Sequence, residues 1–454
     1  MLYFKISTLK FYIRACTVFI LTQLYCFFKH FLEKDDILKI TGIIAEFNPF
    51  HNGHKYIIDC AKKNNSTHIA AAISGNFVER GDSAVISKFA RAEQALKNGV
   101  DLVFEIPVSF SLSGANYYAK AGISILSSVC NEIVFGSECG DIDILKNTAD
   151  LLDTYEVNEL IKQYIKTGIN FPSAREKALK NQKLLNQNKI LTLKNPNDIL
   201  GVEYIRAAKE LNLQSNLKFK TFKRQGAEHN SLLTKNEFAS ASYLRNIILN
   251  SLNANKNENT DKNINNENIE HCKRFMPKSA FDILVNEYNS GRISDINNLY
   301  LAVKAKILLK NEEMFYNITD VSEGIEKKII KAAQNSKTLD ELYFNVKSKR
   351  YTLSRIRRII LNSFLDIDNS YLQLPLPYLR VLAFNKKGEE ILKTTKNKNL
   401  NIITSLKKAE NLNDAAKKLS KKEFDAGNIY SLTYNEVNND KSFLNEYTQK
   451  IIKK

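Results

Sequence analysis

The stretch ITGIIAEFNPFHNGHKYII, residues 40–58, indicates the fold of the first half of the chain. A run of small and branched apolar residues, typical of a buried strand, stops at Glu46. Two of the chain's six histidines then follow only three residues apart, as His51 and His54, with a glycine between them. The pattern predicts a strand that leads through a short loop into a helix beginning near Asn52. Both imidazoles would then lie on one face of the first helical turn.

A helix N-terminus next to two imidazoles is typical of a phosphate site. It offers unpaired backbone N–H groups and partial positive charge, and Gly53 would let a nucleotide approach the backbone. Such donors suit a phosphate whose charge grows during displacement. The alternative is two capping or core histidines, but the frame H-x-G-H after a first strand is more specific than a lone histidine. No metal site is predicted, because helical zinc pairs prefer H-x-x-x-H and no third Cys or His lies at ligand spacing.

Strands and helices alternate from residue 40 to about residue 250, which predicts an α/β fold with a Rossmann-like parallel sheet. The expected strands are residues 39–47, 68–74, 100–107 and 131–136, and the expected helices are residues 52–64, 87–99 and 114–129. Ligands of such sheets bind at the carboxyl ends of the strands. The H-x-G-H motif follows the first of these ends.

A second phosphate-binding element is predicted in FASASYLRNII, residues 238–248. Ser240, Ser242 and Arg245 lie there at the start of an expected helix, and hydroxyls with an arginine at a helix N-terminus suit a phosphate. The alternative is an ordinary surface helix capped by serine.

Composition points to more than one hydrophobic core and to a polyanionic partner. The chain has 454 residues, 44% of them apolar, and a formal net charge of +17. Such a surplus favours nucleic acid or an anionic membrane surface, although a general bias toward lysine would also produce it. The six cysteines show no CxxC spacing and are interpreted as free thiols of a reducing compartment.

We expect four segments along the chain. Residues 1–37 are an apolar extension, residues 38–250 the α/β domain with the predicted phosphate site, residues 251–273 an Asn/Lys-rich linker or loop, and residues 274–454 a mainly α-helical basic region. The extension is interpreted as a misplaced start. A membrane anchor and an ordinary terminal helix are the alternatives.

The H-x-G-H motif with the later Ser/Arg helix resembles the nucleotidylyl-transferase superfamily, whose members form adenylates from ATP on a Rossmann-like sheet. Blocks such as GIIAEFNPFHNGHKY, SGNFVERGDSAVISKFARAEQAL and KSKRYTLSRIRRII are similar to signatures of the tRNA(Met) cytidine acetate ligase family. That resemblance implies a bacterial, cytoplasmic enzyme that activates acetate with ATP, with Mg²⁺ neutralising pyrophosphate. The acetyl group would then pass to N4 of the wobble cytidine of elongator tRNA(Met).

The resemblance also implies which residues contact ATP, with His51 and His54 as the catalytic pair. The first block comprises Ile44, Ala45, Glu46, Phe47, Asn48, Pro49, Phe50, His51, Asn52, Gly53, His54, Lys55, Tyr56 and Ile57. Later contacts would be Gly136, Asn197, Arg224, Ser242 and Arg245. Gly140 and Asp198 remain alternatives to Gly136 and Asn197.

A basic segment is the first candidate for RNA contact. The cations and one aromatic of residues 347–358 are Lys347, Lys349, Arg350, Tyr351, Arg355, Arg357 and Arg358. The alternative is a solvated basic helix face. Lys88 and Arg91 could contact either phosphate or RNA.

Two rival functions are a small-molecule adenylyltransferase of cofactor biosynthesis and a non-catalytic RNA-binding protein with a degenerate nucleotide fold. A membrane-anchored enzyme is a third, if residues 1–37 are translated.

Overall fold

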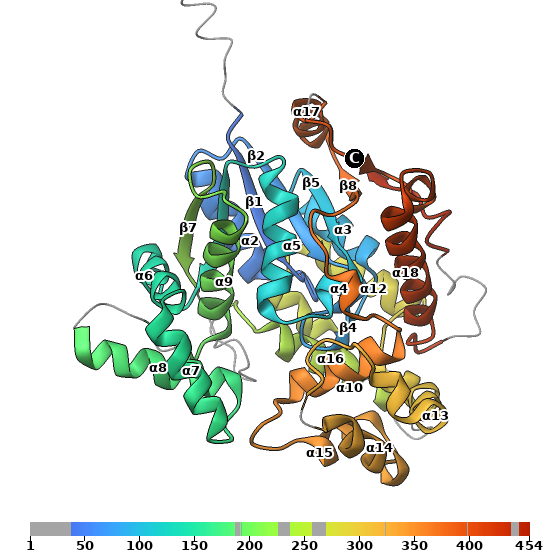
Figure 1. Ribbon diagram of the computed structural model, residues 1–454. Coiled ribbons are helices and arrows are strands. Elements are labelled where there is room, and N and C mark those ends of the chain that lie inside the picture. Colours follow the sequence, from blue (N-terminus) through green and yellow to red (C-terminus); the bar gives the residue numbers. More distant parts are fainter. Residues whose placement is uncertain are drawn as a thin grey trace, which may run out of the picture. The chain divides into compact units, whose positions relative to one another are not determined.

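The computed structural model describes residues 38–186, 191, 193–225, 237–256, 269–322, 324–396, 398–436 and 445–454. The predicted extension, residues 1–37, lies outside this part of the chain, and so do Cys16 and Cys26. Figure 1 shows the arrangement of the helices and strands.

The central sheet confirms the predicted parallel α/β architecture. Its strand order is β10-β8-β5-β2-β1-β6-β7, with β9 also paired to β8. The strands are β1 (Ile40–Ala45), β2 (His68–Ser74), β5 (Leu102–Ile106), β6 (Glu132–Ser137), β7 (Lys218–Lys223), β8 (Leu379–Phe384), β9 (Ile402–Ile403) and β10 (Ile452–Lys453). The five strands from β5 to β7 in this order are mutually parallel, whereas β8 pairs antiparallel with β5.

Helices cover both faces of the sheet because its central strands are apolar on both sides. β1 pairs with β2 in a register that sets Ile44 opposite Ala72, and β2 is buried along its whole length. The helices up to the sheet's last parallel strand are α2 (Asn52–Lys63), α3 (Lys88–Lys97), α4 (Val108–Ser111), α5 (Ala115–Ser127), α6 (Ile142–Leu152), α7 (Tyr155–Lys166), α8 (Phe171–Asn186) and α9 (Pro196–Glu210). Figure 1 shows α5 and α9 in front of the sheet. A short hairpin, β3 (Phe77–Val78) with β4 (Asp82–Ser83), follows β2.

The chain beyond β7 is mainly helical, as predicted. Its helices are α10 (Ala241–Lys256), α12 (Lys278–Asn289), α13 (Tyr300–Lys310), α14 (Ile325–Asn335), α15 (Leu339–Val346), α16 (Leu353–Phe364), α17 (Lys386–Thr394) and α18 (Asp414–Ser431). Short 3₁₀ helices span Lys273–Phe275, Ile296–Leu299, Asn311–Phe315, Asn369–Tyr371 and Leu406–Asn411. None of the helices in the described part of the chain is long and apolar enough to span a bilayer.

The predicted domain boundary at residue 250 stays a prediction. Ile40–Lys454 forms one compact unit, and β8 and β10 extend the sheet of the N-terminal half. The described ends of the predicted linker are helical, since α10 reaches Lys256 and residues 269–272 are helical. Residues 257–268 lie outside the described part.

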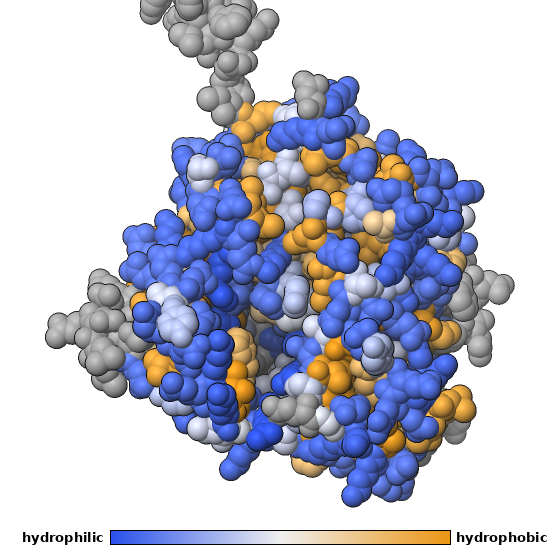
Figure 2. Space-filling model, viewed as in Figure 1, coloured by the Kyte–Doolittle hydropathy of each residue, from blue (hydrophilic) through white to orange (hydrophobic). Residues whose placement is uncertain are grey.

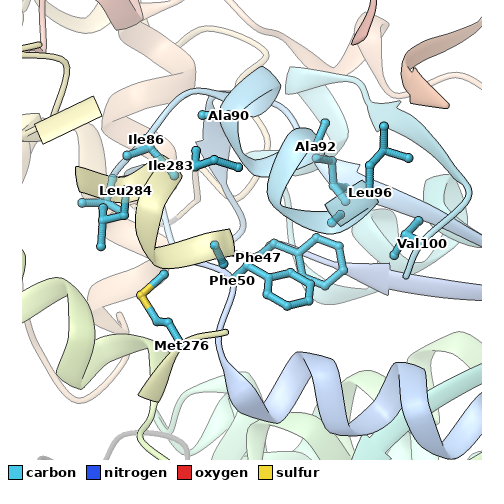
Figure 3. Close-up of a cluster of buried hydrophobic side chains, with 14 of the residues drawn as sticks. Phe47, Phe50, Ile86, Ala90, Ala92, Leu96, Val100, Met276, Ile283 and Leu284 are labelled. Carbon is cyan, nitrogen blue, oxygen red and sulfur yellow. The ribbon is translucent and has the colours of Figure 1, made fainter. Parts of the chain in front are cut away.

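One hydrophobic core supports the loop that carries the histidines. Phe47 and Phe50 are buried in a cluster that also includes side chains of α3, α10 and α12. Figure 3 shows their rings in the space between α3 and α12. Residues distant in sequence therefore hold the turn after β1 in place.

Candidate active site

A cavity of about 1040 Å³ lies at the carboxyl ends of β1 and β6. Its walls come from the loop after β1, the start of α5, the segments 170–175 and 193–210, α10, and residues 350–358. Figure 2 shows a largely hydrophilic face that is hollowed between the region of α7 and α8 and the region of α14 and α15. The position agrees with the rule that ligands bind outside the carboxyl ends of parallel strands.

His51 and His54 hold each other at the N-terminus of α2. His51 is the N-cap, and its Nδ1 accepts a hydrogen bond from the Gly53 backbone N–H at 3.0 Å. The Nδ1 of His54 accepts from the His51 backbone N–H at 3.2 Å, which completes a capping box. A neutral imidazole whose Nδ1 accepts carries its proton on Nε2. Both rings line the cavity.

Gly53 is required by the imidazole of His51. A Cβ at position 53 would lie 2.8 Å from Cε1 and 3.0 Å from Nδ1 of His51. From the sequence, we expected the missing side chain at Gly53 to leave room for a nucleotide. The structure shows that the ring of His51 occupies it.

The turn that presents the two histidines is stiff. Phe47 adopts a left-handed backbone conformation with φ of 49°, which is unusual for a bulky residue. Its ring lies 5.0 Å from that of Phe50 and 4.9 Å from that of His54, measured between centroids. Burial of Phe47 and Phe50 therefore fixes the backbone from which His51 and His54 project.

The predicted ATP block divides into residues that line the cavity and residues that do not. The cavity-lining members are Ile44, Ala45, Glu46, Phe47, Asn48, His51, Gly53, His54 and Ile57. The members that lie elsewhere are Pro49, Phe50, Asn52, Lys55 and Tyr56.

The residues that lie away from the cavity have other partners, and their contact with ATP stays a prediction. Phe50 is fully buried in the core. The amide of Asn52 donates to the carbonyls of Glu237 and Arg274, Lys55 forms an ion pair with Asp59, and the hydroxyl of Tyr56 accepts from Gln225.

Arg245 reaches the cavity from α10. Its Nη1 donates to the Asn48 carbonyl at 2.8 Å, and its Nη2 donates to the Ser242 hydroxyl at 3.1 Å. Burial lowers the pKa of Arg245, and the charges of Glu46 and Asp82 oppose this shift. Ser242 does not line the cavity, and its hydroxyl accepts this hydrogen bond from the guanidinium. Ser240 caps the helix by accepting from the Tyr243 N–H.

A second polar group surrounds Glu138, directly after the carboxyl end of β6. Gly136, Asn197 and Arg224 all line the cavity. The Asn197 amide donates to Glu138 Oε1 at 2.6 Å, and Arg224 Nε lies 4.0 Å from the same oxygen. Burial lowers the pKa of Arg224, and the charge of Glu138 opposes this.

The geometry favours Asn197 over Asp198 and Gly136 over Gly140. Asp198 is 2% exposed, and its carboxylate accepts hydrogen bonds from the Cys139 backbone and the Asn195 amide. Gly140 has a φ of 68° and packs against Lys223, outside the cavity.

The basic segment lies on the same cavity. Arg350, Arg355, Arg357 and Arg358 line it. Lys347 and Lys349 are exposed beside it.

The arginines of α16 already have partners. Arg355 donates to the Asp320 carbonyl and to Ser322 Oγ, and it lies over the ring of Tyr351. Arg358 pairs with Asp320 at 3.1 Å and with Glu79 at 3.3 Å. Tyr351 is buried, and its hydroxyl donates to the Ser322 carbonyl.

The prediction that Lys88 and Arg91 contact phosphate or RNA is wrong. Lys88 is 1% exposed and pairs with Glu105 at 2.5 Å and Glu446 at 3.0 Å. Arg91 is fully buried and donates to the backbone carbonyls of Glu46, Ser74, Gly75 and Ile86. Both side chains therefore form ion pairs or hydrogen bonds in the interior of the protein.

Several cavity residues were not predicted from the sequence. Glu79 and Arg80 lie in the loop after β2, where the strand-end rule gave a usable signal. Phe171 and Arg175 at the start of α8, and Asp320 before α14, carried no such signal.

The described residues contain no group of three His, Cys, Asp or Glu side chains placed to hold a metal ion. The four described cysteines, Cys60, Cys130, Cys139 and Cys272, are free.

Comparison with known proteins gives consistent matches over nearly the whole chain. The family model of the HIGH nucleotidyl transferases matches residues 38–444. The tRNA(Met) cytidine acetate ligase of Thermosipho africanus is 36% identical over 89% of this chain and 97% of that protein. The tRNA(Met) cytidine acetate ligase of Clostridium perfringens is 38% identical over 90% of this chain and 98% of that protein.

Two solved structures of Thermotoga maritima TmcAL resemble this fold, each with 32% sequence identity. The apo form has a TM-score of 0.81, and a form bound with alpha-thio ATP has a TM-score of 0.79. Each match covers 91% of this chain and 99% of the other.

Proposed function

Because the chain belongs to the tRNA(Met) cytidine acetate ligase family, within the HIGH nucleotidyl transferases, we propose that it joins acetate to elongator tRNA(Met) at the expense of ATP. Acetate and ATP would give acetyl-adenylate and pyrophosphate. The acetyl group would then pass to N4 of the wobble cytidine.

One observation carries this proposal. The H-x-G-H turn and the basic segment at residues 350–358, far apart in the sequence, line a single cavity. A small-molecule adenylyltransferase needs only the first of these walls. An enzyme that delivers an activated acyl group to RNA needs both.

The residues of the first wall fit a nucleoside triphosphate. They combine the imidazoles of His51 and His54 with the N-terminus of α2 and with Arg245. Arg245 supplies the fork geometry that suits phosphate. We propose that Gly136, Asn197 and Arg224 contact the nucleotide at the carboxyl end of β6, where a side chain at position 136 would crowd Ile57 and Arg224.

In the first step, an acetate oxygen attacks the α-phosphorus and the bond to the pyrophosphate oxygen breaks. Negative charge grows on the phosphate oxygens during this displacement. His51 and His54 are already oriented by hydrogen bonds to the backbone, so they stabilise that charge without reorganising. Positioning and electrostatics account for catalysis here, with no covalent enzyme intermediate.

Mg²⁺ is expected to bind mainly to the phosphates themselves, because it keeps several waters and takes one or two protein carboxylates at most in such sites. It would neutralise the leaving pyrophosphate. Glu46 is a carboxylate of the H-x-G-H wall that is placed to assist.

The second wall would receive the RNA. A wobble base must leave the anticodon stack before it can reach the adenylate, and proteins hold such bases through backbone contacts and arginine or aromatic planes. We propose that Lys347, Lys349 and Arg350 contact phosphates, because these three side chains are exposed beside the cavity. The substrate tRNA also supports a cytoplasmic location.

The experiment that separates the rival functions is acetate-dependent exchange of labelled pyrophosphate into ATP without RNA. We expect exchange that requires acetate. A small-molecule adenylyltransferase would need its own substrate instead, and a non-catalytic RNA-binding protein would show no exchange.

A further inference from the structure

Acetyl transfer requires a surface that holds the wobble cytosine after it has left the anticodon stack. A base that is extruded in this way loses its stacking neighbours, and proteins replace them with aromatic rings or guanidinium planes. Such a ring has to line the cavity in which the adenylate forms. It also has to be exposed, because a ring packed in the core has no face left for a base.

The phenylalanine and tyrosine rings of the cavity wall differ in how far they are exposed. Those that line the cavity are Phe47, Tyr117, Tyr118, Phe135, Phe171 and Tyr204. Four of them are buried, and Tyr117 is partly buried. Phe171 is 49% exposed, the largest fraction among the described residues of this set. It therefore presents an apolar ring to the cavity that a ligand could cover.

The backbone that carries Phe171 is fixed to the basic segment. Asn170, directly before it, donates a hydrogen bond from its side-chain amide to the Lys349 carbonyl at 3.0 Å. Gly168 has a φ of 88°, and a Cβ at this position would lie 3.5 Å from Nη2 of Arg350. The start of α8 therefore lies against two of the cations for which we propose contact with RNA phosphates.

The ring of Phe171 is oriented by an arginine of the same helix. The guanidinium carbon of Arg175, one turn later, lies 5.5 Å from the ring centroid. Arg175 is 8% exposed, and its Nη2 donates to Glu203 at 2.7 Å. The ion pair fixes the guanidinium, and the cation–π contact then holds the ring. A side chain that is ordered before the ligand arrives loses less entropy on binding.

The neighbours of this ring favour a nucleic-acid base as its ligand. Proteins that bind single-stranded nucleic acid combine cations that follow the backbone with aromatic rings on which bases stack. Phe171 and the exposed cations Lys347, Lys349 and Arg350 form this combination at one edge of the cavity. The adenine of ATP is the other planar group expected in the cavity, and the experiment below separates the two.

We propose that the wobble cytosine stacks on the ring of Phe171 while its N4 amine faces the acetyl-adenylate. This inference rests on the proposed function. Every base has a π-face, so stacking would hold the base in place without identifying it as cytosine.

The test compares RNA-dependent and RNA-independent steps in variants of Phe171. In Phe171→Ala we expect the KM for elongator tRNA(Met) in acetyl transfer to rise roughly 5- to 100-fold, the loss that follows from removing one stacked base. Acetate-dependent pyrophosphate exchange without RNA should not change. Phe171→Trp, which keeps an aromatic plane, should resemble the wild-type protein. Phe171→Leu, which is apolar but has no aromatic plane, should resemble Phe171→Ala.

A tRNA that lacks only the base of its wobble nucleotide shows which base stacks on the ring. Phe171→Ala should bind this abasic tRNA as well as the wild-type protein does, because the stacking partner is already absent. The matched control is Tyr155→Ala, which removes an aromatic residue that is 75% exposed at the start of α7 and lies outside the cavity. It should leave the KM for the tRNA unchanged.

Three results would overturn the inference. They are a wild-type KM in Phe171→Ala, an equal loss of affinity for the intact and the abasic tRNA, and a loss of pyrophosphate exchange as large as the loss of transfer. The last result would assign the ring to the adenine of ATP. Absence of exchange in the wild-type protein would instead refute the proposed function.

Discussion

The imidazole rings of His51 and His54 stack with their centroids 3.8 Å apart and their planes 24° from parallel. Each Nδ1 accepts a backbone N–H of the same turn, so both rings are held before any ligand arrives. This relationship explains why the motif needs two histidines at this spacing and a glycine between them.

Replacing one ring tests its role in the first step. His54→Ala should lower acetate-dependent pyrophosphate exchange by on the order of 10²–10³, because a preorganised donor to the phosphates is removed. Binding of tRNA should change little. The control is His68→Gln, since His68 pairs with Glu390 at the amino end of β2. Loss of tRNA binding in His54→Ala would count against the assigned role.

Substitution of Asn197 should affect ATP binding, whereas substitution of its neighbour Asp198 should affect stability. Asn197→Ala removes a cavity amide and should raise the KM for ATP with little change in the free energy of unfolding. Asp198→Ala leaves the Cys139 N–H without its acceptor and should lower that free energy by about 1–3 kcal/mol. Urea denaturation and exchange kinetics measure the two effects. The reverse pattern would assign the nucleotide contact to Asp198.

The exposed cations beside the cavity should govern RNA affinity. Replacing Lys347, Lys349 and Arg350 together with alanine should weaken tRNA binding at low salt. The slope of log K against log salt should become shallower by roughly 0.7–0.9 for each RNA phosphate that is no longer neutralised. Titration at several salt concentrations measures it.

The matched control replaces Lys386, Lys393 and Lys396, which are exposed on and after α17, at the amino ends of the strands and away from the cavity. It removes the same charge. An equal decrease in slope in both variants would show that only net charge matters.

Arg358 should behave as a structural residue. Arg358→Ala leaves Asp320 and Glu79 without their shared cation, so it should lower the free energy of unfolding by about 1–3 kcal/mol. Arg350→Ala should change it by less than about 0.5 kcal/mol, because that side chain is exposed. Urea denaturation of the two variants checks this. Equal free energies of unfolding in the two variants would mean that the ion pairs of Arg358 do not stabilise the fold.

A buried charge cluster should make stability depend on pH. Burial, and then the charge of Glu105, raises the pKa of Glu423 to about 8. The folded state therefore binds a proton that the unfolded state releases nearer pH 4.5. This contribution to the free energy of unfolding is fully present below pH 4.5 and is lost as pH rises from there through about 8.

Glu423→Gln should remove this dependence, and it keeps an acceptor for the Val108 N–H. Thermal unfolding at pH 6 and pH 9 measures the effect. The wild-type protein should lose more stability between these values than the variant. Parallel curves would show that Glu423 does not titrate in this range.

The strands and the histidine turn could be predicted because local patterns determine them. The second strand was expected at residues 68–74, and β2 occupies His68–Ser74. An apolar run followed by H-x-G-H carries its own signal within a few residues. The same holds for the helix at α2.

The errors concern partners that are remote in sequence. Lys88 follows a strand-end loop and looked accessible, yet it is neutralised by Glu105 of β5 and by Glu446 near the C-terminus. The sequence also did not show that β8 and β10 join the sheet beside β5. Such pairings depend on tertiary packing, which no local pattern encodes.

Incorporation of labelled acetate into purified elongator tRNA(Met), with ATP present, is the decisive experiment for the proposed function. We expect one acetyl group per tRNA, located on the wobble cytidine, and none when that cytidine is replaced by uridine. Adenylate formation without transfer, or acetylation of the uridine-containing tRNA, would contradict the conclusion that one cavity serves both the nucleotide and the RNA.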